Sequence, residues 1–271
     1  MRSLLVHAAE DGTFEARLQV GLDLARRFDA HLTLLQTIAF DMVIPTDPFI
    51  AVGGELSTIT KQRAEEFRKE ITDRLANEDV RWDWQEESGY DGSSMLKHAS
   101  LNDLSLVGAR IGEGKGSTAS PLAGVLAIHC RAPVLVVPGD WHGIDVDAPA
   151  MVCWNGSIQA ARALRAAVPL LRCAEKVHLV SVGDKVTIDA HELPASAAAA
   201  YLDRHGVDCQ PVELPRGSDS VEDVLRSAAR SREAGMMVMG AYGQPRFYET
   251  LFGGTTRTIL SQPSMPVLMA H

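Results

Sequence analysis

The sequence predicts an α/β protein made of two tandem doubly wound domains, each a five-stranded parallel sheet with helices on both faces. Two observations lead to this prediction. The chain of 271 residues contains an internal repeat whose two copies account for nearly its whole length. Within each copy, short apolar runs alternate with longer segments of helical period, which is the order of right-handed βαβ crossovers in a parallel sheet.

The repeat is clearest near the end of each copy. Apolar runs that begin at Pro133 and Pro266 read almost alike and lie 133 positions apart. Just upstream, apolar runs that end at Gly108 and Gly240 lie 132 positions apart. Landmarks that recur in the same order indicate a duplicated domain rather than coincidence.

A third landmark stands near the start of each copy. Asp-Gly-Thr at residues 11–13 corresponds to Asn-Gly-Ser at residues 155–157, at an offset of 144. The offset falls further along because the first copy carries extra chain around residues 39–56. We therefore expect a first domain at residues 1–138, a polar linker at 139–149 and a second domain at 150–271.

The second copy shows the individual elements most plainly. Strands are expected at residues 150–154, 176–182, 207–214, 236–240 and 266–270. Helices are expected at residues 157–172, 189–205, 220–233 and 255–261, because apolar residues share one face at helical spacing. The first copy follows the same order, from a strand at residues 3–6 to a strand at 133–137.

Composition and charge narrow the functional classes. The chain has 26 Lys and Arg against 35 Asp and Glu, and its formal net charge of -9 argues against a nucleic-acid surface, which needs clustered cations. No apolar run approaches the roughly 20 residues of a membrane span. No leader peptide is recognisable at the N-terminus, and four scattered cysteines fit a reducing compartment. We expect a cytoplasmic protein that binds neither nucleic acid nor membrane.

Two loops of the second copy are expected to meet at a ligand-binding edge. In a doubly wound sheet, ligands bind at the carboxyl ends of the strands where the strand order reverses, commonly between the first and fourth strands. Here these strands end at Trp154 and Gly240. The second loop has the pattern G-x2-G-x9-G-G-T-T, formed by Gly240, Gly243, Gly253, Gly254, Thr255 and Thr256.

This pattern suits a phosphate group. Glycines permit positive φ and a close approach of the backbone to a ligand. The amides of Gly254, Thr255 and Thr256 are expected at a helix N-terminus, where unpaired donors and the helix dipole favour an anion. The same residues also fit a glycine-rich turn in which a threonine caps the last helix, and the pattern alone leaves both interpretations open.

The second copy resembles the universal stress protein family. The resemblance lies in the glycine loop, in residues 152–157 (Val-Cys-Trp-Asn-Gly-Ser) and in residues 266–269 (Pro-Val-Leu-Met), and the repeat extends it to both copies. It implies a regulatory, ATP-binding stress-response protein rather than a dedicated catalyst. The residues that it places around ATP, with or without Mg²⁺, are Asn155, Val182, Gly240, Gly243, Gly253, Gly254 and Thr255.

Two of these residues depart from the family pattern. Gly254 stands where the family usually has Ser or Thr, so a hydroxyl is lost and an amide is kept. Asn155 stands where the family usually has Asp, and an amide oxygen is a poorer metal ligand than a carboxylate. Both changes are compatible with ATP binding and argue against more than weak hydrolysis, so no catalytic or metal-binding residue is predicted.

The first copy departs further from the pattern. Aligned on the shared Pro-Val-Leu run, Ser120 and Pro121 fall where Gly253 and Gly254 stand. A proline has no amide hydrogen to offer a phosphate. We therefore expect the nucleotide site in the second copy alone.

Other functions remain open at this stage. The chain could be a nucleotide-free interaction module for an unknown protein partner, or a slow ATPase or nucleotidyl transferase on the same fold. We also expect the apolar fifth strands to pair antiparallel, residues 134–136 with 267–269, because sheet edges need a partner. One chain would then form an internal pseudo-dimer.

Overall fold

The computed structural model describes residues 1–38, 52–111, 118–183, 193–241, 254–261 and 263–271. The elements of residues 1–138, called here the N-terminal half, are β1 (Ser3–His7), α1 (Phe14–Phe28), β2 (His31–Ile38), α2 (Val52–Leu75), β3 (Arg81–Ser88), α3 (Asp91–Ala99), β4 (Leu104–Gly108), β5 (Arg110–Ile111), β6 (Thr118–Ala119), α4 (Pro121–His129) and β7 (Val134–Val137). Those of residues 150–271, the C-terminal half, are β8 (Ala150–Cys153), α5 (Ile158–Leu171), β9 (Val177–Val182), α6 (Ala195–Arg204), β10 (Cys209–Leu214), α7 (Val221–Ser231), β11 (Met236–Gly240), α8 (Gly254–Ser261) and β12 (Val267–Ala270).

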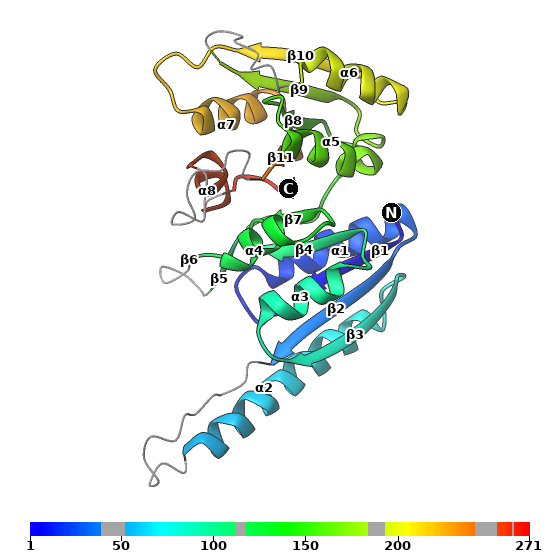
Figure 1. The fold of residues 1–271 in the computed structure, drawn as a ribbon. Coiled ribbons are helices and arrows are strands. Elements are labelled where there is room, and N and C mark those ends of the chain that lie inside the picture. Colours follow the sequence, from blue (N-terminus) through cyan, green and yellow to red (C-terminus); the bar gives the residue numbers. More distant parts are fainter. Residues whose placement is uncertain (39–51, 112–117, 184–192, 242–253, 262) are drawn as a thin grey trace.

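Ten strands form one continuous sheet in the order β10-β9-β8-β11-β12-β7-β4-β1-β2-β3. Each half contributes five parallel strands in the doubly wound order, with its first and fourth strands side by side. The short strands β5 and β6 pair separately. Figure 1 shows the two halves one above the other, with β10 and β3 toward opposite ends of the molecule. The α/β fold class expected from the sequence is confirmed.

The halves join where the two fifth strands meet. β12 pairs antiparallel with β7, with Val267 opposite Val136, Leu268 opposite Leu135 and Met269 opposite Val134. All of these side chains are buried. The strand pairing expected from the sequence is therefore present, and it leaves neither apolar edge exposed.

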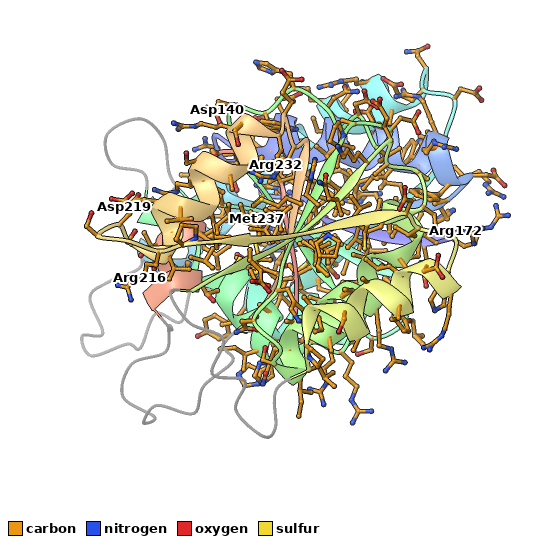
Figure 2. All side chains as sticks on the ribbon, turned by 90° about the horizontal axis from the view of Figure 1, so that it is seen from above. Asp140, Arg172, Arg216, Asp219, Arg232 and Met237 are labelled. Carbon is orange, nitrogen blue, oxygen red and sulfur yellow. The ribbon has the colours of Figure 1, made fainter. Side chains whose placement is uncertain are left out.

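Two apolar cores lie on the two faces of the sheet because successive strand residues point to opposite sides. Leu4 and Val6 of β1 belong to one core, which α1, α2, α5 and α6 cover, and Leu5 belongs to the other, which α3, α4, α7 and α8 cover. Both cores run through both halves. Figure 2 shows Met237 of β11 in the middle of the fold and the charged side chains of Arg172 and Arg216 at its periphery.

One expected helix begins later than the sequence indicated. α6 starts at Ala195 after Pro194, and Leu193 and Pro194 are not helical. A proline disfavours helical conformation in the residue before it and suits the start of a helix. The alanine-rich run that indicated a helix begins only after Pro194, and the helix begins with it.

The segment 139–149 has no helix or strand, but it is held on both sides. The amide of Ile144 donates to Oδ2 of Asp23 in α1 at 2.9 Å, and Ile144 is buried. The carbonyl of Asp147 accepts from the amide of Glu175 in the C-terminal half at 2.7 Å. This segment thus connects α1 directly to the second half.

Candidate functional site

The first loop of the candidate site is a tight turn between β8 and α5. Oδ1 of Asn155 accepts hydrogen bonds from the amide of Ser157 at 3.2 Å and from its hydroxyl at 2.7 Å. Gly156 between them has a φ of 75°, which favours glycine. Oγ of Ser157 in turn accepts from the amide of Ala160 at 3.1 Å and caps α5. The sequence Asn-Gly-Ser therefore forms the turn and the helix cap together.

The second loop begins at Gly240, which packs against the first turn of α5, directly after this turn. A Cβ atom at Gly240 would lie 2.5 Å from the amide nitrogen of Ala160 and 2.6 Å from the carbonyl carbon of Gln159. Only glycine fits this contact, because both neighbours are backbone atoms of α5. The contact brings the carboxyl ends of β8 and β11 together at the point where the strand order reverses.

The end of β11 is fixed on its other side as well. The amide of Ala241 donates to the carbonyl of Ala270 at 2.9 Å, and its own carbonyl accepts from Nδ1 of His271 at 2.8 Å. Ala241, the last described residue of this strand end, is therefore hydrogen-bonded to the end of β12 on both its amide and its carbonyl.

The helix expected after the glycine loop is present as α8 and begins at Gly254. The amides of Gly254, Thr255 and Thr256 lie in its first turn, where they have no partner within the helix. Thr256 is buried, with 6% of its surface exposed. Gly243 and Gly253 lie outside the described residues.

Val182 occupies the carboxyl end of β9, the strand next to β8. It is half-buried, pairs with Leu214 of the edge strand β10 and packs against the core covered by α7 and α8. Its position is one strand away from the Asn155 turn at the same edge of the sheet. Of the residues expected to form the site, Gly240 thus packs against the start of α5, Asn155 lies in the turn that leads into this helix, and Val182 ends the next strand.

Among the described residues of this edge, Cys153 has a clearly shifted pKa. Burial raises the pKa of the Cys153 thiol, at the end of β8, to about 12, so it stays protonated at neutral pH. Across the described part of the chain there is no group of three or more His, Cys, Asp or Glu side chains placed to hold a metal ion.

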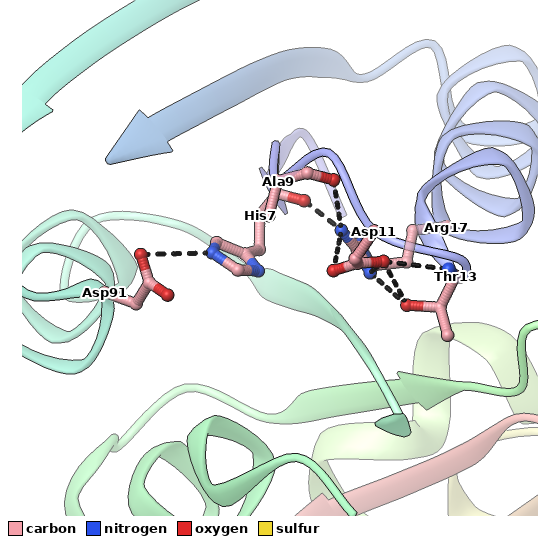
Figure 3. Close-up of polar contacts among 6 residues, drawn as sticks. All are labelled: His7, Ala9, Asp11, Thr13, Arg17 and Asp91. Atoms are coloured by element: carbon pink, nitrogen blue, oxygen red, sulfur yellow. Dashed lines mark hydrogen bonds and ion pairs between the residues drawn. The ribbon is translucent and has the colours of Figure 1, made fainter. Parts of the chain in front are cut away.

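The corresponding turn of the N-terminal half contains an ion pair (Figure 3). Asp11 occupies the place of Asn155, and its Oδ1 accepts from the amide and the hydroxyl of Thr13 at 2.8 and 2.7 Å. Both carboxylate oxygens also accept from Arg17 of α1, at 2.9 and 3.0 Å. Arg17 is completely buried.

Arg17 was not among the residues that the sequence singled out. The signal that could have found it is its position: it stands on the apolar face of α1, one turn after Phe14 and beside Leu18, where a charged residue needs a partner. Burial alone would raise the pKa of Asp11, but the charge and hydrogen bonds of Arg17, together with those of Thr13, hold that pKa below its ordinary value.

A second carboxylate lies at the same edge. Nε2 of His7, at the end of β1, is 3.4 Å from Oδ1 of Asp91 in the first turn of α3. The hydrogen bond of His7 lowers the pKa of Asp91, and burial opposes this shift only partly. His7 itself is 4% exposed.

The N-terminal half also ends its fourth strand with a tightly packed glycine. A Cβ atom at Gly108 would collide with Oγ1 of Thr13 and Nη1 of Arg17. Further along, α4 begins at Pro121, at the place where α8 begins at Gly254. The two halves therefore share one architecture, but in the N-terminal half an arginine side chain and a proline stand where the C-terminal half has neither.

Comparison with known proteins agrees with this architecture. Residues 149–271 match the universal stress protein family model. A universal stress protein from Archaeoglobus fulgidus DSM 4304 has a TM-score of 0.74 at 13% identity, over 99% of this chain and 96% of that one. A functionally unknown protein from Pseudomonas aeruginosa PAO1 has a TM-score of 0.61 at 15% identity, over 100% and 92%. No curated protein matches the chain.

The fold and the edge described above define a tandem doubly wound α/β protein whose two halves are built on one plan. Residues 149–271, a little under half of the chain, are similar to the universal stress protein family. The similarity to the archaeal protein along the whole chain shows that the fold of the N-terminal half is shared as well. Among the described residues, no helix is both long and apolar enough to cross a bilayer.

Proposed function

We propose that this protein is an ATP-binding regulatory protein of the stress response, with its nucleotide site in the C-terminal half. The observation that carries the proposal is the packing of Gly240 against the start of α5, which follows the Asn155 turn, at the switch point of the sheet, together with the helix that begins at Gly254. The match of this half to the universal stress protein family model supports the same assignment.

Each predicted residue has a distinct role in this proposal. The phosphates lie on the backbone of Gly240, Gly243, Gly253, Gly254, Thr255 and Thr256, where amides at a helix start favour anions. The adenine lies against Val182. The side-chain oxygen of Asn155 is used in the turn, so its amide nitrogen is the group that faces a ligand.

The proposal assigns regulation rather than catalysis to the bound ATP. A neutral Asn155 in place of a carboxylate weakens any hold on Mg²⁺, so ATP binds with or without the metal, and hydrolysis is weak at most. We further propose that residues 1–138 and 150–271 are separate domains, and that their shared sheet stands in for a dimer of single-domain relatives. The protein partner and the cytoplasmic location are part of the same proposal.

The first test is whether purified protein carries a nucleotide. Protein freed of nucleic acid is denatured, and the supernatant is separated by ion-exchange chromatography. Release of ATP or ADP is the expected result. If no nucleotide is released and calorimetry with ATP, with and without Mg²⁺, shows no heat of binding, the protein is an interaction module and the proposal is wrong.

The second test locates the site. Gly253→Val places a branched side chain in the proposed phosphate loop and should weaken ATP binding at least about tenfold, or 1.4 kcal/mol. The matched control is Ser120→Val, at the aligned position before α4, which should leave binding unchanged. Equal weakening by both variants, with native circular dichroism, would remove the site from the C-terminal loop.

A further inference from the structure

We propose that the turn between β1 and α1 is a guanidinium site that the chain fills with its own Arg17. The N-terminal half therefore needs no ligand at this edge, and the chain binds one nucleotide rather than two. The statement about Arg17 stands independently; the count of one nucleotide rests on the proposed function of the C-terminal half.

The hydrogen bonds of Arg17 satisfy the whole guanidinium group. Nε donates to the carbonyl of His7 at 3.0 Å, and Nη2 donates to the carbonyl of Ala9 at 3.2 Å. Nη1 and Nη2 also donate to the two oxygens of Asp11, and Nη1 donates to the hydroxyl of Thr13. These five hydrogen bonds equal the five N–H donors of an arginine.

This saturation decides what the group can do. Arg17 has no exposed surface, and every donor already has an oxygen acceptor. It cannot serve as an anchor for an incoming phosphate without breaking bonds to Asp11 or to the backbone. Instead, the carboxylate that could otherwise receive a metal–nucleotide complex is neutralised from within by a bidentate, charge-assisted contact.

The surrounding charges agree with a resident cation. Burial lowers the pKa of Arg17, and the nearby carboxylates of Asp11 and Asp91 oppose that shift. His7, whose carbonyl accepts from Arg17, also contacts Asp91 through its ring. One carboxylate thus contacts the buried guanidinium and the charge of a second one favours it, which is the pairing that a buried cation requires.

The C-terminal half differs at both members of the pair. Arg17 is the fourth residue of α1, and the fourth residue of α5 is Ala161. Asp11, which precedes α1 by three residues, corresponds to Asn155. The charged pair of the N-terminal half is thus a neutral pair in the C-terminal half. The two glycines are nevertheless placed alike, since Gly108 packs against the start of α1 and Gly240 against the start of α5. Among the described residues of this edge, no arginine therefore stands where Arg17 stands in the N-terminal half.

The Arg17 site is tested with a double-mutant cycle in urea. Arg17→Met leaves Asp11 buried without its cation and should lower the folding equilibrium constant roughly a hundredfold or more. Adding Asp11→Asn removes the orphaned charge, so the double variant should be more stable than Arg17→Met alone. A double variant that is less stable than the single variant, or that does not fold, overturns the proposal.

Chemical rescue with a small guanidinium compound tests the Arg17 site independently. Methylguanidinium at millimolar concentration should raise the midpoint of thermal unfolding of Arg17→Ala by about 3 °C, because it binds the folded state alone. The same salt should not stabilise the wild type or Arg27→Ala, which removes a half-exposed arginine from the same helix. Equal effects on all three proteins, or none on Arg17→Ala, contradict a guanidinium site.

The count of nucleotides is tested by transplanting the pair. Asn155→Asp with Ala161→Arg should fill the C-terminal edge and reduce ATP binding at least tenfold while the protein stays folded. Ala166→Arg adds a charge to the same helix further from the loops and serves as the control. Unchanged binding by the transplanted variant overturns the link between the ion pair and occupancy. If the wild type binds no nucleotide, the proposed function fails, and the cycle still decides the Arg17 site.

Discussion

The pairing of β7 with β12 predicts that a disulfide can be introduced between the two strands. In a background without the four native cysteines, Leu135→Cys and Leu268→Cys should form a disulfide within one chain. These residues are directly opposite each other in the antiparallel pair. Opposite residues in such a pair have Cα atoms about 4.5–5.5 Å apart, which falls inside the roughly 4.4–6.8 Å that a disulfide spans.

The energetic effect can be worked out from the loop that the bond closes. About 130 residues separate the two positions, and the loss of chain entropy in the unfolded state would add up to about 5 kcal/mol. The loss of two buried leucines costs about 2–5 kcal/mol each as an upper bound. The useful comparison is therefore between the oxidised and reduced forms of one variant, because the leucine loss cancels.

The assay is non-reducing electrophoresis with mass spectrometry of the linked peptides, followed by urea unfolding of both forms. The matched control is Leu106→Cys with Leu268→Cys. Leu106 pairs with Leu135 on the far side of β7, so it lies two strands, or about 9.5 Å, from Leu268. Cross-links that form only between chains, or equally well in the control, would refute the continuous sheet.

Three further predictions concern single side chains. Because the pKa of Asp11 is lowered in the folded protein, its pair with Arg17 stabilises the fold fully above about pH 4, and this contribution is lost as the pH falls through the folded-state pKa. The difference in unfolding free energy between wild type and Arg17→Met should therefore shrink at pH 2. A difference that stays constant in urea unfolding would contradict this. With its pKa near 12, Cys153 is about one part in 10⁴ thiolate at pH 8, so iodoacetamide should label it only after unfolding, as judged by mass spectrometry. Asp23→Ala removes the acceptor of the Ile144 amide and should cost about 1–2 kcal/mol in urea, with no change disproving the role of this bond.

The sequence predicted the order of the elements because the repeat and the apolar periods are local signals. The glycine at the end of the fourth strand is one such repeated signal. Gly240 has no room for a side chain because it packs against α5, and Gly108 is equally confined at the same place in the first copy. The pairing of the fifth strands was also predictable, because two short apolar edges in one chain need cover. The roles of the individual site residues stay predictions.

Arg17 shows what local signals do not reach. Its partners are Asp11, Thr13 and two carbonyls at the end of β1, and their convergence depends on the angle at which α1 leaves the strand. The position of Arg17 on the apolar face of α1 indicates only that its charge needs some acceptor or carboxylate nearby. A position-by-position comparison of the two copies would have added the decisive clue, because Arg17 and Asp11 change together to Ala161 and Asn155.

The two halves differ in how the charge at this edge is balanced, and they share one continuous sheet. One half holds its own cation in the folded state, and the other half, under the proposed function, receives charge from a ligand. Binding stabilises a folded protein by an amount set by ligand concentration relative to the dissociation constant. Because β7 and β12 share backbone hydrogen bonds and buried side chains, we expect ATP to raise the unfolding midpoint of both halves together. Calorimetric scans that show the C-terminal half alone shifting, as a separate transition, would mean that the junction does not couple them.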